Sequence, residues 1–179
     1  MPDMLKRNPL LVAAAAVMVM AVLVISGALV FEHVFRYEPC ELCYLQRKPW
    51  YAAASGGLLL AFFASKGERA FVRWGLLLLG LVMVISSGLG IWHAGIEWKF
   101  WPGPASCTGS GPLDLAAGLP DLDRRVVLCD EAPVRILGLS FAGWNAVVSL
   151  VAAAIAFWGL TADRQRPAIG AESAESESR

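Results

Sequence analysis

Charged residues are scarce in this sequence, and no stretch of it is strongly basic. Aspartate, glutamate, lysine and arginine make up 17% of the 179 residues, against roughly a quarter in ordinary soluble domains. The 15 basic and 15 acidic side chains leave a formal net charge of zero at pH 7. Because there is no block rich in lysine or arginine, the sequence lacks the electrostatic signature of nucleic-acid binding. The scarcity of charge also argues against an ordinary soluble domain.

Hydrophobic residues, in contrast, make up 57% of the chain, and most of this excess lies in four uncharged runs. Each run is near or above the roughly 20 residues that a helix needs to cross the hydrocarbon layer of a membrane. The sequence therefore predicts an all-α membrane protein whose fold is a four-helix transmembrane bundle. We expect the helices at about residues 9–31, 46–65, 74–94 and 136–162.

The first run has an alternative interpretation as a secretory signal peptide. It exceeds the usual apolar core of such a peptide, which covers about 7–15 residues. Glu32 and His33 follow it, and there is no clean small-residue cleavage site. We therefore expect the run to remain in the protein as its first transmembrane helix.

Basic residues near the helix ends predict the orientation, because cytoplasmic segments of membrane proteins are enriched in lysine and arginine. Such residues precede the first helix, crowd the link between the second and third, and follow the fourth. They are Lys6, Arg7, Lys66, Arg69, Arg73, Arg164 and Arg166. We therefore expect both termini in the cytoplasm and exported loops at about residues 32–45 and 95–135. These loops also contain basic residues, but most stand among acids or in the longer loop.

The sequence outside the helices offers no second domain. The longer loop is rich in glycine and proline, and only Leu113 to Leu119 suits a helical turn or two. Residues 1–162 are therefore expected to form a single transmembrane domain. Residues 163–179 are polar and poor in apolar groups, so we expect a disordered cytoplasmic tail.

The four cysteines all fall in the two predicted exported loops: Cys40 and Cys43 in the first, Cys107 and Cys129 in the second. Disulfides persist in exported compartments, so two cysteine pairs are expected. Cys107 and Cys129 close a longer loop, where a structural staple would contribute roughly 3–4 kcal/mol. A bond across C-x-x-C constrains little chain, and such a pair is more often redox-active or metal-binding.

Two kinds of cofactor site are disfavoured by the cysteine spacing. A four-thiolate zinc site usually presents two closely spaced ligand pairs, whereas Cys107 and Cys129 stand far apart in the sequence. Attachment of a c-type haem needs a histidine directly after the second cysteine, and Tyr44 stands there instead. We therefore expect no metal centre.

The residues around the first pair favour thiol reactivity. Pro39 suits a first helical position, and a turn beginning near Cys40 would direct a positive dipole end towards the sulfurs. Such an environment lowers a thiol pKa. At helical spacing, Cys40, Cys43 and Arg47 share one face. We therefore expect the Arg47 guanidinium beside a thiolate.

Arg47 has an alternative role as an interfacial residue. Long basic side chains at a helix end reach headgroups and water, which is what we expect of Lys48.

Pro49 would break an unbroken helix, so the cysteine turn and the second membrane helix are predicted to be two pieces joined by a kink. A kink at the membrane surface is a suitable place for a pocket.

Together these motifs resemble the DsbB family of disulfide-bond formation proteins. The resemblance rests on "PCELCYLQR", then "WHAG", then a cysteine pair in a proline-rich loop, and finally "LGLSFAGWN", and it covers about residues 5–162. It implies a four-helix protein of the bacterial inner membrane that reoxidises the periplasmic oxidase DsbA. The electrons would pass to a membrane quinone, ubiquinone or menaquinone.

The resemblance also implies roles for individual cysteines. Cys107 would form the mixed disulfide with a DsbA-like partner, and Cys129 would then exchange with Cys40. Cys43 would face the quinone. Electrons could thus pass from a soluble partner to the loop pair and then to the pair at the membrane, where a lipid-soluble acceptor is available.

Two further residues, Arg47 and His93, are implied to bind the quinone. His93 has the alternative of an interfacial histidine bonded to a carbonyl. One departure from the family pattern is Val134 after Pro133, where the family often has an aromatic residue, so loop docking is expected to differ in detail. We assign a packing role to Asn145 and to the segment "SSGLG".

Two rival functions remain open at this point. The chain could be a quinone-linked thiol oxidase specialised for a narrow set of exported substrates and a dedicated partner. Alternatively, it could be a non-catalytic membrane protein with structural disulfides or a metal-binding cysteine cluster. Quinone reduction driven by a reduced dithiol partner distinguishes an enzyme from the non-catalytic alternative.

Overall fold

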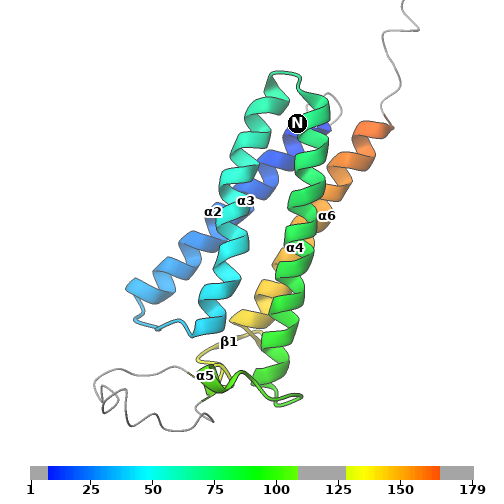
Figure 1. Cartoon of the computed structure of the whole chain (residues 1–179). Coiled ribbons are helices and arrows are strands. Elements are labelled where there is room, and N and C mark those ends of the chain that lie inside the picture. The colour runs from blue at the N-terminus through cyan, green and yellow to red at the C-terminus, as the bar shows by residue number, and fades with distance from the viewer. Residues whose placement is uncertain (1–7, 109–127, 166–179) are drawn as a thin grey trace, which may run out of the picture.

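The computed structural model describes residues 8–108 and 128–165 (Figure 1). Several sequence predictions fall outside these residues. They are the orientation signals Lys6, Arg7 and Arg166, the stretch Leu113 to Leu119, and most of the predicted cytoplasmic tail.

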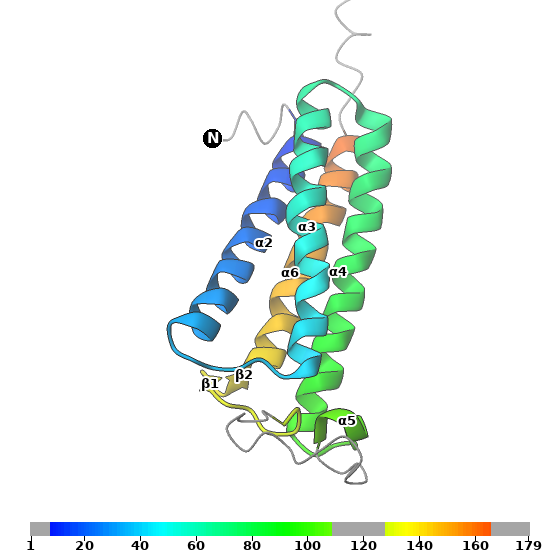
Figure 2. The ribbon, with the colours of Figure 1, turned by 60° about the vertical axis from the view of Figure 1, so that its left-hand side comes forward.

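Four long helices dominate the described part of the chain. They are α2 (Pro9–His33), α3 (Glu41–Ser65), α4 (Arg69–Glu97) and α6 (Phe141–Arg164). The helices run alternately in opposite directions (Figures 1 and 2). Each of α2 and α4 packs against both α3 and α6, so the four helices form a closed ring around one core.

Three of these helices, α2, α4 and α6, are long and apolar enough to cross a membrane. The fourth, α3, has the same 25-residue length as α2, but its first turns carry Glu41, Arg47 and Lys48. The predicted helical membrane protein is confirmed at this level. The fourth membrane span stays a prediction.

Helix α3 begins earlier than predicted and is a single piece. It extends from Glu41 through Pro49 without interruption, so the prediction of two pieces is wrong. Proline lacks the N–H that would bond the carbonyl four residues earlier, which weakens one turn. The buried face nevertheless continues across it, with Leu42 and Gln46 before Pro49 and Trp50 after it. Packing against the neighbouring helices outweighs the lost hydrogen bond.

Helix α6 begins at Phe141 because a tight hairpin occupies the residues before it. Strands β1 (Arg135–Ile136) and β2 (Leu139–Ser140) pair antiparallel. Leu137 (φ 53°) and Gly138 (φ 86°) form the turn in the left-handed region, as the two-residue hairpin geometry requires. The Ser140 side chain then accepts a hydrogen bond from the Gly143 N–H at 3.2 Å, which caps α6.

Small residues bring α4 and α6 close together. The Ser86 and Ser149 hydroxyls are 3.0 Å apart, and the Ser87 hydroxyl donates to the Ala146 carbonyl at 2.9 Å. A Cβ at Gly90 would lie 2.7 Å from the Ala146 nitrogen, so only glycine fits there. The predicted packing role of "SSGLG" is confirmed.

The two ends of the bundle differ in what they carry. The α3–α4 link lies at one end, together with the N-terminus of α2 and the C-terminus of α6 (Figure 1). The short helix α5 (Ala105–Thr108) and the β1–β2 hairpin lie at the other end, which also carries the first turn of α3 (Figures 1 and 2). The candidate site lies at this second end.

Candidate redox site

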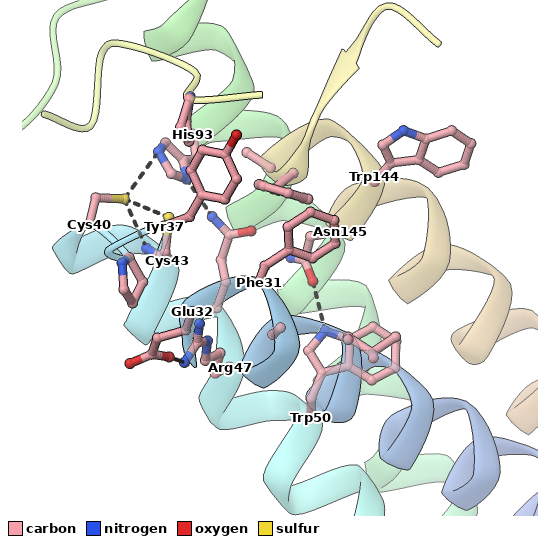
Figure 3. Close-up of a pocket in the computed structure, with 18 of the residues that line it drawn as sticks. Phe31, Glu32, Tyr37, Cys40, Cys43, Arg47, Trp50, His93, Trp144 and Asn145 are labelled. Atoms are coloured by element: carbon pink, nitrogen blue, oxygen red, sulfur yellow. Dashed lines mark hydrogen bonds and ion pairs between the residues drawn. The ribbon is translucent and has the colours of Figure 1, made fainter. Parts of the chain in front are cut away.

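The first cysteine pair is built on the N-terminus of α3. Cys40 is the N-cap residue, and its sulfur accepts a hydrogen bond from the Cys43 N–H at 3.3 Å. Pro39 therefore precedes the cap instead of taking the first helical position. The two sulfurs are 2.7 Å apart and both are free thiols (Figure 3). The predicted helical turn beginning near Cys40 is present.

This position makes Cys40 the more acidic thiol. The hydrogen bond with the Cys43 thiol is the main cause that lowers the pKa of Cys40 to about 5. Burial opposes the shift, and a second hydrogen bond with the His93 ring supports it. The partial positive charge of the helix N-terminus favours the same ionised form. Cys40 is therefore a thiolate near neutral pH.

His93, on α4, connects the two cysteine pairs. Its ring is 2% exposed, with Nδ1 2.6 Å from the Gln46 side-chain amide. The other nitrogen, Nε2, lies 3.7 Å from the Cys40 sulfur and 3.2 Å from the Cys129 carbonyl oxygen. His93 thus contacts a carbonyl, as its alternative interpretation expected, but in the interior and between reactive groups.

The second pair, Cys107 and Cys129, forms a disulfide with a Cα–Cα distance of 5.3 Å. Both residues are buried, and they pack with Cys40 and Ile96 in one cluster at the end of the bundle. The Cys40 sulfur, His93 Nε2 and the Cys129 sulfur all lie within 4.8 Å of one another. The fold therefore brings together two cysteine pairs that are far apart in the sequence.

Arg47 makes a contact that the sequence analysis did not foresee. Its guanidinium forms an ion pair with Glu32 of α2, and the two side chains are 14% and 18% exposed. The Tyr44 hydroxyl donates to the same carboxylate at 3.2 Å, and the guanidinium lies 5.3 Å from the Tyr44 ring centre. In Figure 3 the Arg47 and Glu32 side chains lie apart from Cys40 and His93. The positive charge of Arg47 is therefore compensated by a carboxylate.

A mainly apolar cavity of about 470 Å³ adjoins the first cysteine pair. Residues from the C-terminal part of α2 and from α3, α4 and α6 line it (Figure 3). Cys40, Cys43, Arg47 and His93 all line it. Its apolar lining includes Leu23, Val24, Ala28, Phe31, Trp50, Phe141 and Val148.

Asn145 forms part of the wall of this cavity and joins three helices. Its Oδ1 accepts a hydrogen bond from the Trp50 indole N–H at 2.7 Å, and its Nδ2 donates to the Ser86 carbonyl at 3.4 Å (Figure 3). The predicted packing role of Asn145 is confirmed. Trp50 is 1% exposed, so this network fixes a large side chain beside the cavity.

Sequence reasoning missed Glu32, Gln46 and Glu97. Glu97 is 8% exposed, with Oε1 3.9 Å from His93 Nε2, and its Oε2 makes no hydrogen bond within the described residues. Helical spacing offered a signal for two of them, since Gln46 follows Cys43 by three positions and Glu97 follows His93 by four. No local spacing links Glu32 to Arg47, because that pair depends on how α2 packs against α3.

Comparisons with known proteins identify the family of this chain. The family model described as "Disulfide bond formation protein DsbB" matches residues 9–159. A Disulfide bond formation protein B of Marinobacter nauticus is 34% identical over 69% of this chain and 75% of its own length. Another, of Herminiimonas arsenicoxydans, is 30% identical over 77% of this chain and 87% of its own length.

A third relative, the Disulfide bond formation protein B of an Azoarcus species, is 28% identical and covers 89% of this chain and 96% of its own length. No solved structure matches the chain significantly. The family match includes all four cysteines, Arg47 and His93. The chain therefore belongs to the DsbB family of disulfide bond formation proteins.

Proposed function

We propose that this chain is a thiol–disulfide oxidoreductase of the bacterial inner membrane that reoxidises a DsbA-like exported protein and transfers the electrons to a membrane quinone. The observation that carries the proposal is the convergence of both cysteine pairs on His93, with the Cys40 and Cys129 sulfurs within 4.8 Å. A structural staple alone would not need a second, free cysteine pair beside it. In this proposal α3 is the fourth membrane span and the cysteine end of the bundle faces the periplasm.

Electron transfer between the pairs follows from thiol–disulfide exchange. A thiolate of the reduced partner attacks Cys107, forms a mixed disulfide and releases Cys129 as a thiolate. Cys129 attacks the Cys40 sulfur of the oxidised first pair, which forms a Cys40–Cys129 bond and releases Cys43. The partner's second thiol resolves its mixed disulfide, releasing the oxidised partner and the Cys107 thiolate.

The last exchange restores the loop disulfide. Cys107 attacks Cys129, forms the Cys107–Cys129 bond and releases Cys40 as a thiolate. The low pKa of Cys40 makes it a good leaving group in this step. The result is one loop disulfide and two thiols at α3, which is the arrangement of bonds in the structure. Two electrons and two protons have then moved from the partner to Cys40 and Cys43.

The cavity beside Cys43 suits a quinone. Its volume of about 470 Å³ lies within the range of about 300–1,000 Å³ that is typical of small-molecule sites. Its lining is mainly apolar, with a smaller number of polar side chains that include Cys43, Arg47 and His93. A bound quinone supplies the acceptor for the two electrons and two protons that the Cys40–Cys43 dithiol gives up. Arg47 and His93 would hold its polar ring.

The test is a purified preparation of the chain with a reduced DsbA-like partner and a short-chain quinone. We expect the ultraviolet absorbance of the quinone to fall, with one quinone reduced for each partner disulfide formed. A catalytically inactive preparation that keeps its fold would favour the alternative, a non-catalytic membrane protein with structural disulfides. The control is the same mixture without the partner.

A further inference from the structure

We propose that Cys40, Cys43, Cys129 and His93 form a binding site for a thiophilic divalent cation such as Zn²⁺, which is available only when the Cys107–Cys129 disulfide is reduced. Cation binding is not a step of the oxidation cycle proposed above, although the site shares three cysteines with that cycle. Its consequence for electron flow rests on that proposed function, whereas its existence does not.

The donor atoms are already gathered in one place. The Cys40 sulfur, His93 Nε2 and the Cys129 sulfur lie within 4.8 Å of one another, and all three residues are buried. The Cys43 sulfur lies 2.7 Å from that of Cys40 and completes a set of three sulfurs and one nitrogen. Three cysteines and one histidine are an established donor set for tetrahedral zinc.

The separations suit a cation of this size. Zinc bonds to sulfur at about 2.3 Å and to imidazole nitrogen at about 2.0–2.1 Å. The donors of a tetrahedral site are therefore roughly 3.5–4 Å apart. The Cys40 sulfur lies 3.7 Å from His93 Nε2 and 2.7 Å from the Cys43 sulfur. The donors come from the start of α3 (Cys40 and Cys43), from α4 (His93) and from the segment before β1 (Cys129).

His93 is oriented as a metal-ligating histidine is. Its Nδ1 is held 2.6 Å from the Gln46 side chain, which leaves Nε2 directed at the sulfurs (Figure 3). A hydrogen bond at the second ring nitrogen is what fixes ligating histidines in metal sites. The Glu97 carboxyl lies 3.9 Å from Nε2, and one of its oxygens is unpaired within the described residues.

The loop disulfide determines whether the site exists. A disulfide sulfur is not a thiolate, so Cys129 becomes a donor only after two electrons and two protons from the partner dithiol convert the disulfide into two thiols. The cation then displaces the protons of Cys40, Cys43 and Cys129, and no electron moves in that step. A bound cation keeps Cys40 and Cys43 reduced and would stop electron flow through the chain.

Co²⁺ is the probe for this site, because tetrahedral cobalt bound to thiolates absorbs strongly in the visible and near ultraviolet. The full chain, in detergent and fully reduced under argon, is titrated with Co²⁺ and then with Zn²⁺. We expect one cobalt per chain with a tetrahedral thiolate spectrum, which zinc abolishes, and no such spectrum from the chain with the Cys107–Cys129 disulfide intact. A reduced chain without the thiolate spectrum overturns the proposal.

The variants Cys107→Ser and Cys129→Ser each lose one thiol, so a difference between their cobalt spectra shows which of the two cysteines is a metal ligand. Cys107→Ser should keep the full spectrum and affinity, because Cys107 is not a donor. Cys129→Ser should lose charge-transfer intensity and bind cobalt at least tenfold more weakly, as should His93→Ala. Circular dichroism checks that each variant keeps its helices. Equal cobalt binding by Cys107→Ser and Cys129→Ser overturns the assignment.

Metal-free samples of the same preparations are assayed for quinone reduction by the reduced partner. If the parental chain reduces quinone but binds no cobalt, this inference fails and the proposed function stands. If it binds cobalt as described but never reduces quinone, the proposed function fails and the cation site stands.

Discussion

Arg47 is held by a carboxylate, and this changes what its removal does. The ion pair with Glu32 is mostly buried, so losing one partner leaves the other charge uncompensated. The Arg47–Glu32 pair also lines the cavity, next to the first cysteine pair. Arg47 therefore combines a structural contact between α2 and α3 with a position at the proposed quinone site.

We predict that Arg47→Met raises the apparent KM for quinone and slows electron transfer to it. Exchange between the partner and the loop cysteines should stay nearly unchanged, because within the described residues Arg47 pairs with Glu32 and not with Cys107 or Cys129. Steady-state quinone titrations and single-turnover thiol exchange measure the two steps separately.

Lys48→Met is the matched control, since Lys48 is exposed and adjacent in the sequence. It should change neither step. The double variant Glu32→Gln/Arg47→Met should regain thermal stability relative to Arg47→Met, because no charge is then left unpaired. Equal effects of the Arg47 and Lys48 substitutions on the quinone titration would reduce Arg47 to a membrane anchor.

The ionisation of Cys40 predicts a pH dependence. Its pKa of about 5 in the folded chain lies below the value of about 8.5 of an unperturbed cysteine. Ionised Cys40 therefore stabilises the reduced fold fully above about pH 8.5, and this contribution is lost as the pH falls through 5. Thiolate absorbance in the ultraviolet, followed from pH 4 to 9, should show one group titrating near pH 5.

Two substitutions of Cys43 test how much its hydrogen bond lowers the pKa of Cys40, compared with the helix N-terminus and His93. Cys43→Ser keeps a hydroxyl that can donate to the Cys40 sulfur, so the midpoint should stay low. Cys43→Ala removes the donor and should move the midpoint upward. Identical midpoints in these two variants would mean that the helix terminus and His93, and not Cys43, control the acidity of Cys40.

At the scale of helices, the α4–α6 contact depends on two glycines in very different surroundings. Gly88 and Gly90 both lie in α4, but a Cβ at Gly88 would meet nothing within 4 Å. At Gly90 it would meet the α6 backbone. We predict that Gly90→Ala destabilises the bundle by about 1–3 kcal/mol through overpacking. Gly88→Ala should be neutral or stabilising by up to about 1 kcal/mol.

Thermal unfolding of both variants in the same detergent measures this difference. The comparison is internal to one helix, so detergent and helix propensity affect both variants alike. Similar melting temperatures for the two variants would contradict the close α4–α6 approach at Gly90.

The helices also show which parts of the fold could be predicted from sequence. Hydrophobic runs indicated all four long helices, because burial in lipid imposes a length and a composition on each segment. The start of α3 could not be predicted in this way, because Leu42 and Gln46 are buried by neighbouring helices and not by lipid. The hairpin before α6 was missed as well, since Leu137 occupies a left-handed position that usually favours glycine or asparagine.

In the candidate site, too, the sequence identified the residues but not the contacts between them. The cysteines, Arg47 and His93 were identified from motifs and from the family resemblance. The contacts that define their chemistry were not: Gln46 beside His93, Glu32 beside Arg47, and Cys40 beside Cys129. Each of these contacts joins different elements, so it depends on how the elements pack and not on local spacing.

For the molecule as a whole, we predict that the cysteine end of the bundle faces the periplasm. The four cysteines are mostly buried, so labelling needs an exposed site at each end: Lys99 near the cysteines and Lys66 in the α3–α4 link. In a background with every cysteine replaced by serine, Lys99→Cys should react with an impermeant maleimide in cells stripped of their outer envelope. Lys66→Cys should react only after the inner membrane is permeabilised. The reverse pattern would invert the topology.

The relay through the whole molecule predicts two separable half-reactions. In a Cys107→Ser/Cys129→Ser variant, the partner should no longer be oxidised, because the loop disulfide that it attacks is gone. Quinone should still oxidise the Cys40–Cys43 dithiol, since those residues line the cavity directly. Each half-reaction is followed by trapping free thiols after a single turnover. Partner oxidation at the parental rate would return the loop disulfide to the role of a staple.

The burial of the loop disulfide has a consequence for selectivity among reductants. Cys107 is 6% exposed and Cys129 is fully buried, so a small thiol diffusing in solution has almost no line of attack on either sulfur. In the proposed function, a partner protein would bind at this end of the bundle, and the free energy of that contact could offset the cost of exposing the disulfide. If the chain has the proposed function, this enclosure is a kinetic barrier that slows reduction of the loop disulfide by free thiols and favours its reduction by a bound protein.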